Sequence, residues 1–161
     1  MGLAPDLLQL ANRMAAYEGP NHSQAALRRS VSTAYYALFH LLTEDAGQRW
    51  QGSIEAATGL ERALNHGPMK ATSIQFKNLN WKDWHGVVEA VPPALRSVSR
   101  AFINLQEERH AADYDNHVQW TITDVDAVLD TAAGAFQDWL SIRSHPMAGN
   151  YLLSMLLGKQ R

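Results

Sequence analysis

Apolar residues recur at steps of three and four along most of this chain, which is the spacing of one face of an amphipathic helix. The longest such pattern begins after Asn21 or Ser23, either of which can cap a helix, and extends to about Ala46, before Gly47. The sequence predicts one long helix here, with an apolar face formed by Leu27, Val31, Ala34, Tyr35, Leu38 and Leu42.

A shorter helix is predicted ahead of it, because Pro5 suits a first helical turn and Gly19-Pro20 is a stop signal. Its apolar stripe consists of Leu3, Leu7, Leu10, Met14 and Tyr17. The pattern is poorer over residues 48–84, where we expect mainly loops, with short helices near residues 55–64 and 69–76 on either side of the break NHGP.

Two more long helices are predicted in the second half of the chain. Pro92-Pro93 starts one that DYDN stops, and its apolar stripe is Leu95, Val98, Phe102, Leu105 and Ala112. Thr123 with Asp126 has the spacing of a capping box and starts the other, which ends near His145-Pro146. Its apolar positions are Val125, Val128, Leu129, Ala132, Phe136, Trp139 and Leu140.

The sequence contains no convincing alternating run of the kind that forms strands, no internal repeat and no low-complexity linker. It therefore predicts an all-α protein, an antiparallel four- to five-helix bundle over residues 1–145. Residues 146–161 are expected to form either a short docked helix or a contact for a partner.

Composition narrows the function classes only slightly. A length of 161 residues with 46% hydrophobic and 19% charged residues is ordinary for one globular domain. The formal net charge of −2 gives no general attraction to nucleic acid, so any such contact needs a local patch. The absence of cysteine excludes disulfides, cysteine nucleophiles and zinc–thiolate sites. The N-terminal segment has no signal-peptide pattern and residues 151–157 are too short a tract to cross a bilayer, so we expect a cytoplasmic protein.

Arg109 interrupts the apolar stripe of the helix that starts at Pro92-Pro93. At 100° per residue it falls within the arc of that stripe, so its stem is expected to be covered by the bundle and its guanidinium to need partners. Two interpretations stay open. Arg109 forms an ion pair with Asp113 or Asp115 that fixes the helix end, or its fork binds a ligand phosphate in bidentate fashion.

A second anomaly lies on the long helix, opposite its apolar face. Arg29, Thr33, Tyr36 and His40 follow one another at steps of four, three and four. Either this helix is central and contacted on both sides, or the row lines a polar cleft.

The remaining histidines lack the paired spacing and clustered acids of a metal site, so no metal and no cofactor is predicted. Arg62 and His66 stand one turn apart and can be read as a pair. His66 precedes Gly67-Pro68, however, and is interpreted equally well as a helix-ending residue.

Two stretches together, RRSVSTAYYALFHLL at residues 28–42 and LQEERHAADYD at residues 105–115, resemble the HEPN superfamily and specifically its short, stand-alone bacterial branch. The resemblance implies a HEPN-like helical bundle, often a homodimer, in which polar residues of two copies meet in a cleft. It also implies a metal-independent endoribonuclease of a toxin–antitoxin or defence system, often encoded beside a nucleotidyltransferase-like partner. Other members of the superfamily only bind RNA or a nucleotide.

The catalytic residues that the resemblance implies are Arg109 with His110 and His117. Active members carry an arginine, a polar residue and then a histidine a short way on. Arg109 and His110 match the start of this motif, whereas Tyr114, Asp115 and Asn116 occupy the places expected for the histidine and His117 lies just beyond. The candidate ligand-binding residues are Arg29, Tyr36, His40, Asp113 and Tyr114.

The sequence thus supports two expectations of function. In one, the domain binds RNA in a dimeric cleft, Arg109 stabilises charge on the scissile phosphate, and a histidine moves protons without a metal. In the other, it is an inactive module that binds a nucleotide or a partner protein.

Overall fold

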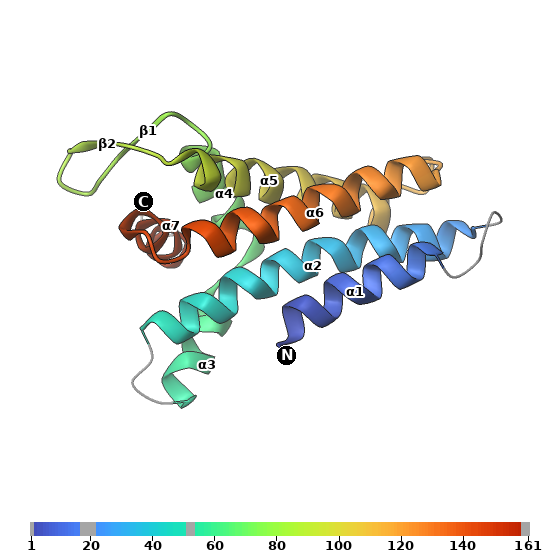
Figure 1. Cartoon of the computed structure of the whole chain (residues 1–161), viewed down its shortest axis with the longest axis horizontal. Helices are drawn as coiled ribbons and strands as arrows, with labels where there is room; N and C mark the ends of the chain where they lie inside the picture. Colours follow the sequence, from blue (N-terminus) through green and yellow to red (C-terminus); the bar gives the residue numbers. More distant parts are fainter. Residues whose placement is uncertain (1, 17–21, 51–53, 159–161) are drawn as a thin grey trace.

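The computed structural model describes residues 2–16, 22–50 and 54–158, which form seven helices and one small hairpin (Figure 1). The elements are α1 (Leu3–Ala16), α2 (Gln24–Arg49), α3 (Ile54–Ala63), α4 (His66–Phe76), β1 (Asn80–Lys82), β2 (Val88–Ala90), α5 (Pro93–Tyr114), α6 (Ile122–Ile142) and α7 (Pro146–Leu157). The described residues are mostly helical, which confirms the predicted all-α class.

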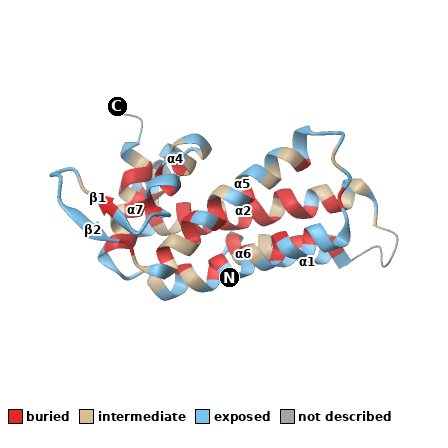
Figure 2. Cartoon of the chain, turned by 90° about the horizontal axis from the view of Figure 1, so that it is seen from above, coloured by how far each residue is buried: buried red, intermediate tan, exposed pale blue. Residues whose placement is uncertain are grey.

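The four longest helices, α1, α2, α5 and α6, lie side by side, and helices consecutive in this set run in opposite directions (Figure 1). The long helix α2 contacts α1, α5 and α6, and buried residues follow it for most of its length (Figure 2). Helices α3, α4 and α7 and the hairpin gather at one end of this set. That this packing is the HEPN arrangement stays a prediction.

The predicted apolar stripes of α2 and α5 are buried in full. On α6 the stripe is buried except for Leu140, which is 48% exposed. The cap predicted at Asn21 or Ser23 is made by Ser23, whose hydroxyl accepts a hydrogen bond from the amide of Ala26. Asn21 itself lies outside the described residues.

The face that α1 buries differs from the predicted leucine stripe. Ala4, Ala11 and Ala15 are buried, whereas Leu3 is 49% exposed. Small side chains allow the backbones of α1 and α2 to approach closely, and the Ser30 hydroxyl of α2 donates a hydrogen bond to the Ala11 carbonyl oxygen across 2.7 Å. Close backbone contact therefore orients α1, and of the predicted leucines Leu7 packs partly buried against the core whereas Leu3 and Leu10 are exposed. Tyr17, the last residue of the predicted stripe, lies outside the described residues.

Gly47 is inside α2 and does not end it. A Cβ at this position would lie 2.8 Å from Oε1 of Glu61 and 3.0 Å from the carbonyl oxygen of Ala57, both on α3. The glycine was interpreted as a stop signal, but its role is to let α3 pack tightly against the last turns of α2.

The start of α6 is two residues earlier than predicted. The capping box consists of Thr121 and Asp124 rather than Thr123 and Asp126. The register is explained by the preceding residue, because the side-chain amide of Gln24 exchanges two hydrogen bonds with the backbone of Trp120, at 2.8 and 2.9 Å. A chain that is held at Trp120 begins its helix directly afterwards.

The weakly patterned region holds both predicted short helices, and α4 begins at His66 rather than Met69. His66 therefore starts a helix, and the interpretation of it as a helix-ending residue is wrong. The sequence also missed the antiparallel pairing of β1 with β2, in which Trp81 faces Glu89. Each strand has only three residues, too few for an alternating pattern. Trp81 is buried and stacks on Phe76 of α4 with ring centroids 4.9 Å apart.

The C-terminal segment forms α7, which packs against α4. Tyr151 is fully buried, and its hydroxyl lies 2.7 Å from the Ser73 hydroxyl of α4. Pro146 occupies the first turn of α7, and His145 caps it by accepting a hydrogen bond from the amide of Met147. None of the helices in the described ranges is both long enough and apolar enough to cross a membrane.

The packing of α1 can be tested by enlarging its buried face. Ala11→Leu should lower the free energy of unfolding by about 1–3 kcal/mol, because a larger side chain must separate α1 from α2. Leu3→Ala, on the exposed face, should change it by no more than about 0.5 kcal/mol. Chemical denaturation measures both, and the reverse order of effects would show that the leucines form the buried face.

Candidate functional site

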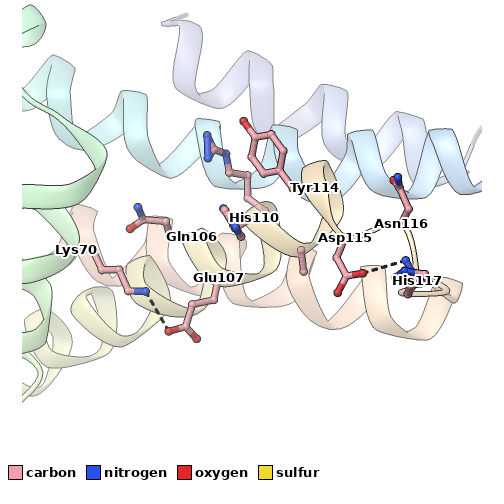
Figure 3. Close-up of a pocket in the computed structure, with 10 residues that line it drawn as sticks. Lys70, Gln106, Glu107, His110, Tyr114, Asp115, Asn116 and His117 are labelled. Carbon is pink, nitrogen blue, oxygen red and sulfur yellow. Dashed lines mark hydrogen bonds and ion pairs between the residues drawn. The ribbon is translucent and has the colours of Figure 1, made fainter.

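A hollow of about 630 Å³ lies beside the C-terminal half of α5 (Figure 3). Its lining combines α4, α5 and the loop that follows α5, and includes Lys70, Arg109, His110, Tyr114, Asp115 and His117. All three residues predicted as catalytic candidates, Arg109, His110 and His117, therefore line one hollow. Of the predicted ligand-binding residues, Tyr114 also lines it.

His117 reaches the hollow because the chain turns back directly after α5. The Asp115 carboxylate accepts a hydrogen bond from the amide of His117 across 2.9 Å, as Figure 3 shows. Arg28 of α2 fixes the same turn, since its guanidinium donates to the carbonyl oxygens of Ala112 (2.9 Å) and Val118 (2.7 Å). A histidine that is displaced along the sequence is thus held at the same hollow as the arginine.

Arg109 is held mainly by aromatic faces. Its Cζ lies 5.4 Å from the ring centroids of both Tyr35 and Tyr36 of α2, within the range of a cation–π contact. Its Nη2 donates a hydrogen bond to the Tyr36 hydroxyl across 3.2 Å. The side chain is only 14% exposed, which confirms that the bundle covers its stem.

Of the two acids that the sequence left open, Asp113 is the partner of Arg109. Its Oδ2 lies 3.4 Å from Nε of Arg109, and it also accepts a 3.4 Å hydrogen bond from the Ser32 hydroxyl. The distance makes an ion pair, but Nε is buried and has no hydrogen bond with acceptable geometry. Asp113 therefore neutralises Arg109 incompletely.

Arg109 also keeps a terminal nitrogen for other partners. Within the described ranges Nη1 makes no hydrogen bond. It is also absent from the buried polar atoms that lack a partner, so it reaches solvent. The guanidinium is thus fixed in position while one of its nitrogens faces outward.

The row predicted on α2 does not line a single cleft. Thr33 lies against Met14 of α1, with its hydroxyl 3.9 Å from the sulfur, while Tyr36 contacts Arg109 of α5. Arg29 is exposed, and neither it nor His40 is among the described residues that line the hollow. The row is explained by a central helix contacted on both sides, the first of the two interpretations.

His66 belongs to the Arg109 cluster, which sequence spacing did not indicate. Its Nδ1 shares a short hydrogen bond with the hydroxyl of Tyr35, and its ring lies 4.5 Å from that of Phe39. Tyr35 and His66 are 31 residues apart and on different helices, so only tertiary packing brings them together.

Burial sets the protonation states of this pair. It raises the pKa of the Tyr35 phenol well above its usual value, although the positive charge of Arg109 opposes this, so Tyr35 keeps its proton. Burial also lowers the pKa of His66, and the charges of Arg109 and His40 lower it further. His66 is therefore neutral near pH 7.

The other groups of the hollow are more exposed. His110 packs on Tyr114 with ring centroids 5.0 Å apart, and Lys70 pairs with Glu107 across 3.3 Å. Cations and acids are thus both present. Across the described ranges, no three histidine, aspartate or glutamate residues are grouped so that they could hold a metal ion.

Comparison of the chain with protein-family models, curated proteins and solved structures finds no match. The function must therefore be argued from the geometry of the hollow and from the resemblance of the two short sequence stretches.

The lowered pKa of His66 predicts a change of stability with pH. As pH falls through the ordinary histidine pKa of about 6.5, the unfolded chain binds the proton before the folded chain does. The stabilisation present above that pH is therefore lost below it. Glutamine at this position removes the titration, so the free energy of unfolding of wild type minus that of His66→Gln should shrink as pH falls. Chemical denaturation at several pH values measures this difference, and a difference that is constant with pH would refute the lowered pKa.

Proposed function

We propose that the hollow beside α5 binds the phosphate backbone of RNA, with Arg109 as its principal contact, and that the protein is a HEPN-type domain of a bacterial toxin–antitoxin or defence system. The observation that carries the proposal is the state of Arg109. It is fixed by two tyrosine rings, only partly neutralised by Asp113, and its Nη1 bonds to no residue of the described ranges.

A purely structural arginine would be expected to use its donors within the fold. The buried Nε of Arg109 has no hydrogen bond, and a buried charged group with unused donors is costly unless a ligand completes it. Holding the planar group in advance reduces the entropy lost on binding, and its fork suits a phosphate. Phosphate binding therefore accounts for the geometry better than the ion pair alone.

The same hollow supplies groups for metal-independent cleavage. In this chemistry the ribose 2′-oxygen attacks the adjacent phosphorus, the 5′-oxygen leaves, and a 2′,3′-cyclic phosphate forms. One histidine accepts the proton of the 2′-hydroxyl and another donates a proton to the leaving oxygen. His110 and His117 are the proposed pair, and Arg109 stabilises the charge that develops on the phosphate.

We also propose that the protein is cytoplasmic and, as the resemblance implies, a homodimer. Two copies would join α2 and α5 across the interface and place two Arg109 side chains in one cleft. Tyr114, 67% exposed at the edge of the hollow, offers an aromatic surface for such a contact. A nucleotidyltransferase-like protein is the proposed cognate partner.

One observation favours the second candidate, an inactive module that binds a nucleotide or a partner protein. Glu107, which pairs with Lys70, and Asp115 also line the hollow and add negative charge to it. A long polyanion gains less from such a balanced surface than one phosphate group or a protein with mixed charges does.

The proposed chemistry predicts RNA cleavage that survives EDTA. Arg109→Ala should abolish RNA binding and cleavage, and Arg109→Lys should restore little, because a point charge lacks the fork. His117→Ala should retain binding while cleavage falls by about 10²–10⁴-fold if His117 moves a proton. Gel-based cleavage and filter binding measure these effects with purified protein.

The control for that assay is Arg100→Ala, an exposed arginine of α5 outside the hollow. Its loss should leave both activities unchanged. RNA binding without any cleavage would favour the inactive module, and activity only after magnesium is added would contradict the metal-independent chemistry.

The proposed dimer predicts a particle of twice the chain mass in light scattering at micromolar concentration. Tyr114→Glu should shift it toward monomer, because the charge would be buried against the second copy. A monomer at all concentrations of the wild type would contradict the dimeric cleft.

A further inference from the structure

Arg109 and His66 lie against the same pair of tyrosines. The Cζ atom of Arg109 is 5.4 Å from both ring centroids, and the His66 ring is 5.5 Å from Tyr35 and 5.9 Å from Tyr36. The two side chains come from α5 and α4 and meet over α2. His66 is thus a titratable neighbour of the proposed phosphate contact, and the mechanism above does not use it.

The backbone of His66 contacts a residue that lines the hollow. Its carbonyl oxygen accepts a 3.3 Å hydrogen bond from the side-chain amide of Gln106, and Gln106 lines the hollow together with Lys70, one turn along α4 from His66. The cluster and the hollow therefore share the junction between α4 and α5.

The hydrogen bond to Tyr35 fixes the tautomer of His66. The Tyr35 side chain is fully buried, and Nδ1 of His66 is the acceptor available to its hydroxyl in the described part of the molecule. A buried phenol that keeps its proton must donate it, so Nδ1 accepts. The neutral imidazole then carries its own proton on Nε2. The positive end of the α4 helix dipole, at which His66 stands, favours the same neutral state.

That Nε2–H is available to a ligand. It makes no hydrogen bond to any described residue, and it is not one of the buried polar atoms without a partner, so it reaches solvent. Tyr36 also has an unused donor. Its hydroxyl oxygen accepts a hydrogen bond from Arg109, and no described residue accepts the hydroxyl proton. Three unused donors, on Arg109, Tyr36 and His66, thus lie at the tyrosine pair.

We infer that these donors form one anion site, in which His66 binds the same RNA phosphodiester group as Arg109, and that Tyr35 is the positioning residue that holds the His66 ring. This inference rests on the function proposed above and adds a ligand contact that neither short sequence motif contains. The site favours a phosphodiester because neutral and cationic donors lie at the same tyrosine pair, where the Asp113 carboxylate beside Arg109 is already engaged by Arg109 and Ser32.

A bound anion changes the titration of His66. Its neighbours are Tyr35, Tyr36 and His40 on α2 and Arg109 on α5, while Glu61 of α3 acts on His40. The positive charges of Arg109 and of His40, when it is protonated, disfavour the imidazolium of His66 in the free protein. A phosphodiester placed among them offsets that repulsion, so binding should raise the pKa of His66.

The test uses a 2′-O-methyl oligouridine, which carries phosphodiester groups but cannot be cleaved by its own 2′-oxygen. Histidine side-chain ¹⁵N spectra of the wild-type protein should show His66 with its proton on Nε2, and the oligonucleotide should raise its pKa. His66→Ala, which removes the ring donor, should weaken binding about tenfold, the loss of one hydrogen bond to a charged group. Tyr35→Phe, which keeps the ring, should shift the tautomer signal and weaken binding severalfold.

His85→Ala is the matched control, since His85 is exposed on the hairpin, and it should leave binding unchanged. If Arg109→Ala abolishes binding while the oligonucleotide leaves the His66 signals and their titration unchanged, His66 is not part of the site although the proposed function stands. If the wild type does not bind the oligonucleotide, both proposals fail. The wild-type spectra decide the matter even if a variant does not fold.

Discussion

The contact between the Arg109 guanidinium and the rings of Tyr35 and Tyr36 is the interaction on which the site depends. It joins α5 to the central helix at a point where a charge would otherwise be buried without adequate partners. Aromatic faces attract a cation without neutralising it, whereas a well-aligned carboxylate would satisfy its donors. The fold thereby holds a positive charge in a fixed place and keeps it available.

The central helix α2 supplies most of the supports for this arrangement. Its first turns hold the loop after α5 through Gln24 and Arg28, and its middle carries the tyrosine pair. Tyr35 is fully buried, so the hydrophobic core fixes its ring and, through its hydroxyl, His66. A change in the packing of α2 would therefore be transmitted to α4, to α5 and to the loop after α5, which together line the hollow.

Sequence patterns predicted the parts of this protein that depend on local periodicity. The buried faces of α2 and α5, the cap at Ser23 and the covered stem of Arg109 all follow from helical spacing. The family resemblance drew attention to His110 and His117, although only the turn at Asp115 explains why His117 lies beside the hollow. The sequence predicted several of the residues that line the hollow, but not the hollow itself.

The parts that were missed depend on contacts between distant segments. The α1 face is set by the approach of its backbone to Ser30, and the start of α6 is set by the clamp of Gln24 on Trp120. Gly47 resembled a stop signal because nothing local shows that α3 passes against it. Helical spacing offered Arg62 as a partner for His66, whereas its hydrogen-bond partner in the structure is Tyr35 on another helix.

The most direct measurement of the central claim is a double-mutant cycle on Arg109 and Asp113, each changed to Ala singly and together. If the tyrosines hold the arginine and Asp113 neutralises it only in part, the coupling free energy from chemical denaturation should be below about 1 kcal/mol. A coupling of about 3 kcal/mol or more would show a strong structural ion pair, which would leave Arg109 without the free charge that phosphate binding requires.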